Sequence, residues 1–433
     1  MDHFEEIIGY SEIKTELRRI ADVLQGHEAY QKLGVKSPRG LLLHGDPGVG
    51  KTLMASCLVK ASGRPCFMCR KDRPDGEFVD AIRETFDKAK TAAPSIVFLD
   101  DMDKFANEDM QTKDAEEYVT VQSCIDELKG HEVFVLATVN SIHELPDSLL
   151  RAGRFDRVIE VDLPDQADAA EIICHYMSSR NFSAEIDAER ISRIIAGRSC
   201  AELETIINEA GLYAGFERSG VITEEHFLKA CLHIVFEVPI EKQKSLPNED
   251  MKKRAAYHEA GHAVMQELLA PGSVTLISLY SKRSNYNGFI AACMDPCVLD
   301  TLQREKISIL VNLSGIAAED QILGNHGCGG FRDIDDAFSA VKGLLTRACT
   351  SGFRLHSLRG QSDTLVSEQE TAVAAEVERY FRRSKEILAA HSEFLHHLAK
   401  KLMERELLGE QDVESIKTEL GIKALDPSSL YSF

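Results

Sequence analysis

A short apolar run followed by a glycine-rich loop is the feature that most constrains this chain of 433 residues. Residues 40–44 have the composition of a buried strand, and residues 53–58 favour a helix. The loop between them has the pattern G-x-x-x-x-G-K-T and consists of Gly45, Asp46, Pro47, Gly48, Val49, Gly50, Lys51 and Thr52. A strand, this loop and a helix predict a phosphate-binding site, because backbone N–H groups and the helix N-terminus face the anion. We expect Lys51 to reach the outer phosphates and the Thr52 hydroxyl to hold Mg²⁺.

A second buried strand is predicted at residues 95–99, and two carboxylates follow it directly, Asp100 and Asp101. Ligands bind at the C-terminal edge of parallel sheets, so this is where the acids would be used. We expect Asp100 to organise the magnesium shell and Asp101 to polarise the attacking water. Another apolar run, residues 133–138, ends near Asn140.

Three arginines follow at three-residue intervals, Arg151, Arg154 and Arg157. They form either a solvated charged face or a set of cations presented to phosphate.

The chemistry of the second half centres on residues 257–263, Tyr-His-Glu-Ala-Gly-His-Ala, in a run from 251 to 270 that predicts one helix. His258 and His262 are four apart, so both side chains project from one face, where they could bind one zinc ion. Glu259 could take a proton from a water bound to that metal. The alternative is a pair of helix-face histidines beside a surface glutamate.

A catalytic zinc site needs a third protein ligand and one open position for water. The residues alone leave this ligand undecided among five carboxylates downstream: Glu319, Asp320, Asp333, Asp335 and Asp336.

Composition restricts the remaining possibilities. The chain is 44% hydrophobic and 28% charged, with a formal net charge of −20, which argues against a nucleic-acid or anionic-membrane surface. No stretch reaches the ~18 apolar residues of a membrane helix. We therefore expect no membrane segment in this chain and a cytoplasmic location, with membrane association only if an N-terminal anchor has been removed.

These motifs together resemble a known family. The phosphate loop, the acidic strand end, Asn140 and the segment 149–157, Leu-Leu-Arg-Ala-Gly-Arg-Phe-Asp-Arg, are similar to an AAA-type ATPase. With H-E-A-G-H downstream, the chain resembles the FtsH family of ATP-dependent zinc metalloproteases from about residue 4 to residue 410.

The resemblance implies further site residues. Asn140 would sense the γ-phosphate, while Arg151 and Arg154 would reach the nucleotide of a neighbouring subunit in a homohexameric ring. Ile8 and Gly9 would contribute to the adenine pocket, with His175 nearby. Asp333 would be the third zinc ligand; the alternative is that it only caps a helix.

The implied fold is an α/β AAA module, with a parallel sheet, helices on both faces and a helical lid, followed by a mainly α zinc metallopeptidase domain. The expected ranges are 1–165 for the large ATPase domain, 166–236 for the lid, 237–250 for a linker, 251–410 for the peptidase and 411–433 for a C-terminal tail. Bound ATP, Mg²⁺ and Zn²⁺ are expected.

Two departures from the family pattern bear on function. The acidic pair is usually Asp-Glu, whereas here it is Asp100-Asp101, so we expect slow ATP hydrolysis. The substrate-gripping loop is usually an aromatic-Val-Gly segment, whereas residues 70–78 are charged, and only Phe78 could supply the aromatic ring. The leading hypothesis is an ATP-dependent endopeptidase acting on unfolded or misfolded proteins. The alternatives are an ATP-binding switch or scaffold with a weak motor, and a peptidase limited to unfolded chains.

Overall fold

A computed structural model describes residues 2–26, 30, 32–34, 37–71, 78–105, 115–151, 153–184, 186–239, 248–280, 288–293, 301–356 and 362–426. Most of the expected linker, 240–247, lies outside these residues, as do residues 72–77 of the expected substrate-gripping loop. The chain divides into two compact units, Met1–Glu209 and Ala210–Phe433. This division falls inside the segment expected to form the lid, and the sequence-based boundaries remain predictions.

The first unit is built on a five-stranded parallel sheet in the order β2-β3-β4-β1-β5. Its strands are β1 (Gly40–His44), β2 (Cys66–Cys69), β3 (Ser95–Leu99), β4 (Val133–Val139) and β5 (Arg157–Glu160). β3 and β4 are buried along their whole length, which explains why they are mainly apolar in sequence. Because β3 and β4 are neighbouring parallel strands, Asp100 after β3 and Asn140 after β4 lie at the same edge of the sheet.

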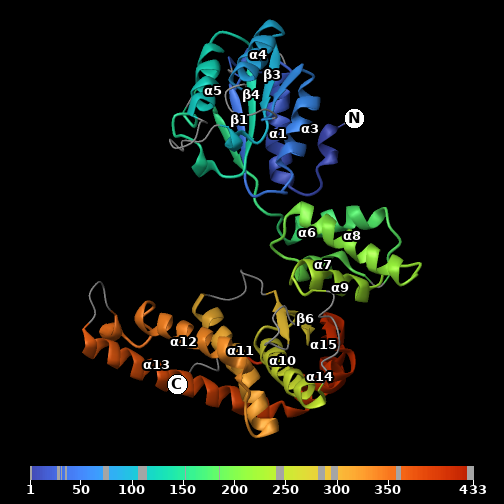
Figure 1. Ribbon diagram of the computed structural model, residues 1–433, viewed down its shortest axis with the longest axis vertical. Helices are drawn as coiled ribbons and strands as arrows, with labels where there is room; N and C mark the ends of the chain where they lie inside the picture. The colour runs from blue at the N-terminus through green and yellow to red at the C-terminus, as the bar shows by residue number, and fades with distance from the viewer. Residues whose placement is uncertain are drawn as a thin grey trace. The chain divides into compact units, whose positions relative to one another are not determined.

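Helices cover both faces of this sheet. α1 packs with α3 on one side and α4 packs with α5 on the other (Figure 1). These helices are α1 (Ser11–Leu24), α3 (Lys51–Ser62), α4 (Phe78–Thr91) and α5 (Ala115–Glu127).

The spacing of Ile13, Leu17, Ile20 and Leu24 predicts a helix over residues 5–33, but α1 begins only at Ser11. It is preceded by a 3₁₀ turn, η1 (His3–Glu6), and the chain breaks at Gly9 and Tyr10, whose φ angles are 69° and 53°. A left-handed backbone cannot continue a right-handed helix.

Four helices follow the sheet, as predicted: α6 (Gln166–Ser178), α7 (Ala188–Ile194), α8 (Cys200–Phe216) and α9 (Glu224–Ile234). Asp165 and Asp187 cap the first two, because each carboxylate accepts a backbone N–H from the first turn.

The second unit is mainly helical around α10 (Glu249–Leu269), which packs on α11, α13 and α14. The other helices are α11 (Thr301–Leu323), α12 (Phe331–Thr346), α13 (Asp363–Ala390), α14 (Ser392–Arg405) and α15 (Glu410–Leu420). A small antiparallel sheet has the order β7-β6-β8, with β6 (Val274–Ser278), β7 (Phe289–Ala292) and β8 (Leu407–Gly409). α10 and α11 cross closely at Gly261, where an added Cβ would lie 2.5 Å from the Ser314 carbonyl oxygen.

The C-terminal region differs from the expectation. The apolar stripe in residues 370–408 predicts one helical run. The observed helix is interrupted at His391 and gives way to β8, because Glu406 adopts a φ of 61°. Residues 411–420, expected to belong to a C-terminal tail, form most of α15 (Glu410–Leu420). Val413 and Ile416 are buried, and the Lys417 ammonium lies 2.7 Å from the buried Glu267 carboxylate of α10. This apolar face and ion pair fix α15 on the second unit.

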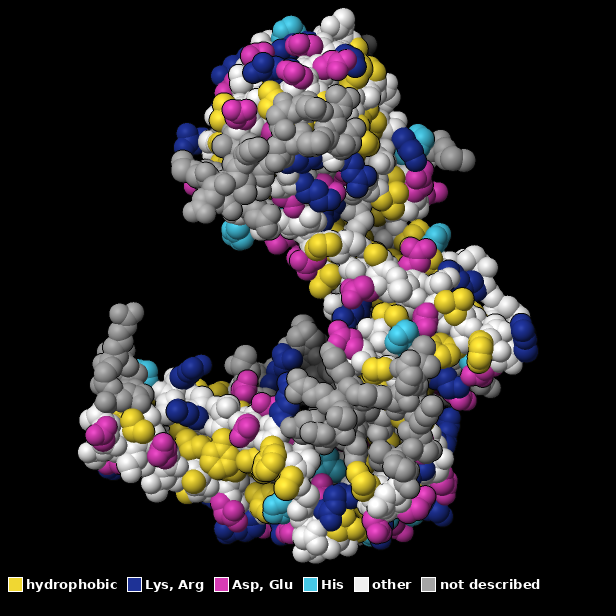
Figure 2. Space-filling model, in the orientation of Figure 1, with side chains coloured by type: hydrophobic (Ala, Val, Ile, Leu, Met, Phe, Trp, Pro, Cys, Tyr) yellow, Lys and Arg dark blue, Asp and Glu magenta, His cyan; other side chains and the backbone are white. Residues whose placement is uncertain are grey.

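Figure 2 shows acidic and basic side chains interspersed on this face of each unit. Among the described residues, no helix is both long enough and apolar enough to cross a membrane.

Candidate functional site

The glycine-rich loop lies between β1 and α3 in a conformation that requires glycine. The φ angles of Gly45, Gly48 and Gly50 are 149°, 82° and 96°. A Cβ on Gly45 would lie 2.0 Å from the Val161 carbonyl oxygen. The backbone, rather than side chains, therefore shapes this loop, as a phosphate-binding loop requires.

Lys51 is buried in this loop and aimed at it. Its ammonium donates to the carbonyl oxygens of Gly45 (2.7 Å) and Asp46 (2.9 Å) and to Oδ1 of Asn140 (3.1 Å). Burial lowers the pKa of Lys51, although neighbouring acids such as Asp103 oppose this shift. The structure thus brings together Lys51 and Asn140, which are 89 positions apart in sequence.

A hydroxyl and a carboxylate meet beside the loop in the arrangement expected for magnesium. The Thr52 hydroxyl donates to Oδ1 of Asp100 at 2.9 Å, and the Thr138 hydroxyl donates to the same oxygen at 2.9 Å. Asp100 is 2% exposed. Hydroxyl and carboxylate oxygens suit Mg²⁺, so Thr52 and Asp100 fit this ion.

Asp101 lies at the same edge but its carboxylate is engaged elsewhere. Its φ is 53°, and Oδ2 lies 2.6 Å from the Lys104 ammonium and 3.7 Å from the Arg70 guanidinium. Its role with the attacking water remains a prediction.

Asp103 is a site residue that the sequence interpretation missed. Both the backbone N–H and the side-chain amide of Asn140 donate to Asp103 Oδ2, at 3.0 and 2.9 Å. This buried carboxylate orients the amide that contacts Lys51. The signal available in sequence was the third acid in Asp100-Asp101-Met102-Asp103.

The two arginines expected to serve a neighbouring subunit differ in environment. Arg154 pairs with Asp126 of α5, Nη2 to Oδ2 at 2.7 Å, and donates to the Ser148 carbonyl; the Asp126 carboxylate raises its pKa. Arg151 is exposed. Their roles between subunits remain predictions.

Phe78 cannot be an exposed substrate-gripping residue. It is 1% exposed, and its ring packs edge-on against Phe105 with centroids 5.1 Å apart. The one aromatic residue that could have served in this loop is therefore unsuited to it, because its ring belongs to the core between α4 and the sheet.

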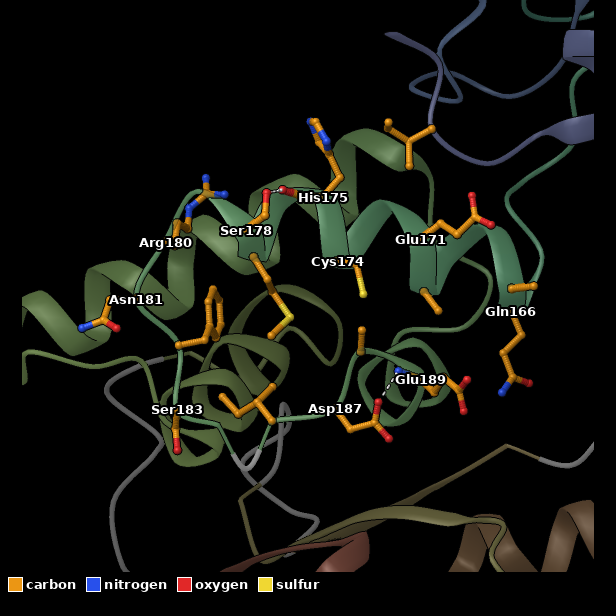
Figure 3. A pocket seen from close by; sticks show the side chains of 17 residues that line it. Gln166, Glu171, Cys174, His175, Ser178, Arg180, Asn181, Ser183, Asp187 and Glu189 are labelled. Atoms are coloured by element: carbon orange, nitrogen blue, oxygen red, sulfur yellow. Dashed lines mark hydrogen bonds between the residues drawn. The ribbon is translucent and has the colours of Figure 1, made fainter. Parts of the chain in front are cut away.

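Two of the three residues expected near the adenine base line one open groove of 1430 Å³ beside α6 and α7. Ile8 and His175 both contribute to its lining. Figure 3 shows His175 on one side of α6, while Cys174 points toward the side of α7. Gly9 is packed against α6, since a Cβ there would lie 2.9 Å from Asp168 Oδ1.

The second site is a cluster of His258, His262 and Asp333. Nε2 of His258 lies 3.1 Å from Nε2 of His262 and 3.1 Å from Oδ2 of Asp333, and His262 Nε2 lies 3.7 Å from that oxygen. One ligand atom from each residue falls within 4.8 Å of the others. Two imidazole nitrogens and a carboxylate oxygen are a donor set for catalytic zinc.

The other ring nitrogens fix the orientation of the histidines. Nδ1 of His258 donates to Glu319 Oε1 at 2.8 Å, and Nδ1 of His262 donates to the Val311 carbonyl at 2.6 Å. Both Nε2 atoms are thus directed to the shared centre, as in protein metal sites generally. Burial would lower the pKa of His258, but Asp333 and Glu319 raise it to about 10, while the two histidines lower the pKa of Asp333.

The structure thereby distinguishes the five carboxylates considered as third ligand. Glu319 supports His258 from behind and is held by Arg254, and Asp320 pairs with Lys385. Asp335 and Asp336 are exposed. Asp333 makes no side-chain cap on α12. Among the described residues, His258, His262 and Asp333 alone form a cluster suited to a metal.

Replacing Glu319 with glutamine should weaken zinc binding roughly 10–100-fold, because partners of metal-bound histidines have effects of this size. The amide can still accept one hydrogen bond from His258 but no longer supplies negative charge. Competition with a chromophoric chelator measures the dissociation constant. Glu305→Gln on the same helix is the control, and equal zinc affinity in both variants would contradict this assignment.

Glu259 lies next to the two histidines in sequence and is 5% exposed. Burial raises its pKa to about 7, although the neighbouring histidines oppose the shift. A carboxylate with this pKa is suited to exchange protons near neutral pH. Gly288, at the start of β7, lies so close that a Cβ would be 2.6 Å from Glu259 Oε1.

Gly315 of α11 is a second close approach that sequence reasoning did not single out. A Cβ there would lie 2.4 Å from His262 Nε2 and 2.8 Å from His258 Cε1. We expect Gly315→Ala to displace both rings and to lower zinc content to less than a tenth, measured by atomic absorption on the folded protein. Gly343→Ala on α12, where nothing lies within 4 Å of the added Cβ, is the control. Full zinc occupancy in Gly315→Ala would contradict this geometry.

Comparisons with known proteins match the two sites to two family models. Residues 41–163 match the ATPase family associated with various cellular activities (AAA). Residues 245–416 match peptidase family M41, a range that includes most of α15.

Whole-chain relatives carry both parts. Three are the ATP-dependent zinc metalloprotease FtsH 2 of Sphaerobacter thermophilus (29% identity) and the ATP-dependent zinc metalloproteases FtsH of Ureaplasma parvum and Karelsulcia muelleri (both 30%). Each alignment covers 95% of this chain, and 66%, 60% and 70% of the respective relative. The chain thus spans less than two thirds of the first two. A parallel-sheet nucleotide module followed by a mainly helical unit with a His-His-Asp cluster, and similarity over nearly the whole chain, place this protein in the FtsH family of AAA zinc metalloproteases.

Proposed function

We propose that this chain is an ATP-dependent zinc endopeptidase that hydrolyses peptide bonds in unfolded or misfolded proteins. The observation that carries the proposal is the convergence of His258, His262 and Asp333 on one centre, with the buried Glu259 beside it. The family relationship and the phosphate loop in the same chain support the coupling to ATP.

Peptide hydrolysis follows from the roles of these side chains. A zinc ion held by His258, His262 and Asp333 would polarise the scissile carbonyl and lower the pKa of a water. Glu259 would accept a proton from the attacking water and return it to the leaving amine. Among the described residues, β7 is an edge strand of its sheet, and an extended substrate pairing with it would have its scissile bond oriented.

The nucleotide site would supply the energy for substrate delivery. Lys51 would contact the outer phosphates, Thr52 and Asp100 would hold Mg²⁺, and Asn140 would contact the γ-phosphate. Arg151 and Arg154 would act on the nucleotide of a neighbouring subunit, which requires a ring; a homohexamer is the proposed assembly. For Arg154 this requires its release from Asp126.

The proposed division of the chain follows the expected boundaries, with a large ATPase domain over 1–165, a lid over 166–236, a linker over 237–250 and the peptidase from 251. The burial of Val413 and Ile416 supports extending the peptidase through α15.

Degradation of a fluorescently labelled unfolded protein tests this function. We expect cleavage in the presence of ATP, Mg²⁺ and Zn²⁺. Cleavage should be lost when a zinc chelator is added and should return when excess zinc is supplied. A zinc-loaded protein that cleaves neither an unfolded protein nor a short peptide would refute the proposal.

A second candidate is an ATP-binding ring with a weak motor, serving as a switch or scaffold or as a peptidase limited to unfolded chains. The pairing of Asp101 with Lys104 and the burial of Phe78 favour it. Folded and unfolded versions of one substrate, compared in wild type and Lys51→Ala, distinguish the two. ATP-independent cleavage restricted to the unfolded version would favour the weak motor.

A further inference from the structure

Two cations surround the acidic pair at the end of β3. The Arg70 guanidinium lies 3.9 Å from Asp100 Oδ2 through Nε and 3.7 Å from Asp101 Oδ2 through Nη2. The Lys104 ammonium lies 2.6 Å from the same oxygen of Asp101. Both carboxylates that the proposed function assigns to magnesium and water therefore already face positive charge.

Contacts of the neighbouring residue Lys71 hold Arg70 and Lys104 in place. Lys71, next to Arg70, pairs with the buried Glu117 at 3.1 Å and donates to the Lys104 carbonyl oxygen at 3.3 Å. This contact ties the end of β2 to the 3₁₀ turn η2 (Met102–Lys104) that follows Asp101. The contact between Lys71 and the Lys104 carbonyl thus keeps the backbone of Arg70 and of Lys104 close to Asp101.

Stability is a poor explanation for this arrangement. The side chains of Arg70 and Lys104 are 62% and 57% exposed. Exposed ion pairs of long side chains contribute little to folding, because water screens them and their side chains lose entropy.

The electrostatic consequence for the nucleotide site is direct. A magnesium ion held by Thr52 and Asp100 would carry two positive charges into the surroundings of Arg70, and like charges at such separations repel. The Lys104 ammonium, 2.6 Å from Asp101 Oδ2, also restrains the orientation of this carboxylate and reduces its negative charge toward a neighbouring water.

We propose that Arg70 and Lys104 form a cationic clamp on Asp100 and Asp101 that opposes binding of magnesium with ATP and restrains Asp101 during hydrolysis. The two cations are positioning residues, because they act through the carboxylates. The inference rests on the proposed ATPase function and extends it by naming a second restraint on the basal rate, besides the short side chain of Asp101.

Nucleotide binding measured with and without magnesium tests the clamp. In Arg70→Gln and Lys104→Gln, we expect the magnesium concentration that half-saturates binding of a fluorescent ATP analogue to fall about two- to fivefold, the factor that exposed ion-pair energies imply. Binding in EDTA should be unchanged or weaker, since a positive charge near the phosphates is lost. Basal phosphate release at saturating Mg²⁺ should rise by a similar factor.

Matched variants separate the clamp from a structural role. Arg70→Lys keeps the charge and should restore most of the wild-type magnesium requirement, and Arg83→Gln, an exposed change on α4, should behave as wild type. A lowered melting temperature of Arg70→Gln with the wild-type magnesium requirement would show a structural role and overturn the clamp.

The remaining outcomes are equally distinct. A wild-type chain that binds Mg·ATP with the same magnesium requirement as both glutamine variants would overturn the clamp alone. A wild-type chain that binds no ATP at any magnesium concentration would overturn the proposed ATPase function, and the clamp with it.

Discussion

Replacing Glu259 with glutamine should lower the rate of peptide-bond hydrolysis roughly 10²–10⁴-fold, the range expected when a general base is removed. Glutamine has nearly the same shape, so the α10 backbone and both histidines keep their places. The amide cannot accept the proton of the attacking water. Cleavage of a labelled unfolded protein, followed at saturating ATP and zinc, measures the loss.

Zinc content and ATP hydrolysis provide the controls for Glu259→Gln. Neither should change, because Glu259 is not among the clustered ligands and lies in the unit that does not contain the phosphate loop. Glu249→Gln, an exposed change in the first turn of α10, should retain full activity. If Glu259→Gln cleaved the substrate as fast as wild type, the proposed mechanism would be excluded.

Replacing Asp101 with glutamate should raise ATP hydrolysis, up to roughly 100-fold. The longer side chain advances the carboxylate by about one C–C bond, and a displacement of ~1 Å can cost ~100-fold in rate. It also moves the oxygens away from the geometry in which Lys104 holds them at 2.6 Å. Phosphate release at saturating Mg·ATP measures the effect.

The control for this substitution is Asp87→Glu, which lengthens an exposed acid on α4 in the same unit. Its hydrolysis rate should match wild type. A hydrolysis rate in Asp101→Glu equal to or below wild type would mean that the short carboxylate is not what limits turnover.

Much of the nucleotide site follows from sequence because its determinants are local. Gly45, Gly48 and Gly50 adopt the backbone angles that only glycine tolerates, so their spacing specifies the loop. β3 and β4 are buried on both faces and are therefore mainly apolar, with Ser95 and Thr138 as their polar residues. The side chains that each loop or strand end carries then meet at one sheet edge.

What sequence could not supply depends on tertiary contacts. From their sequence positions, Glu319 and Asp333 are equally acceptable partners of His258. Only the packing of α11 and α12 shows that Glu319 contacts Nδ1 and that Asp333 contacts Nε2. The sequence left open whether Phe78 is exposed, and only the packing of its ring against Phe105 shows that it belongs to the core. α15 was missed because its anchoring partner, Glu267, lies 150 positions away.

The ion pair between Lys417 and Glu267 bears on how the chain tolerates clipping near its C-terminus. Glu267 is 3% exposed and also accepts the backbone N–H groups of Gly272 and Val274. Loss of residues 410–420 would leave a buried anion without its cation, a defect that typically costs about 3–5 kcal/mol. That defect would fall at the end of the helix that carries His258 and His262, so trimming far from the metal would still loosen its ligands.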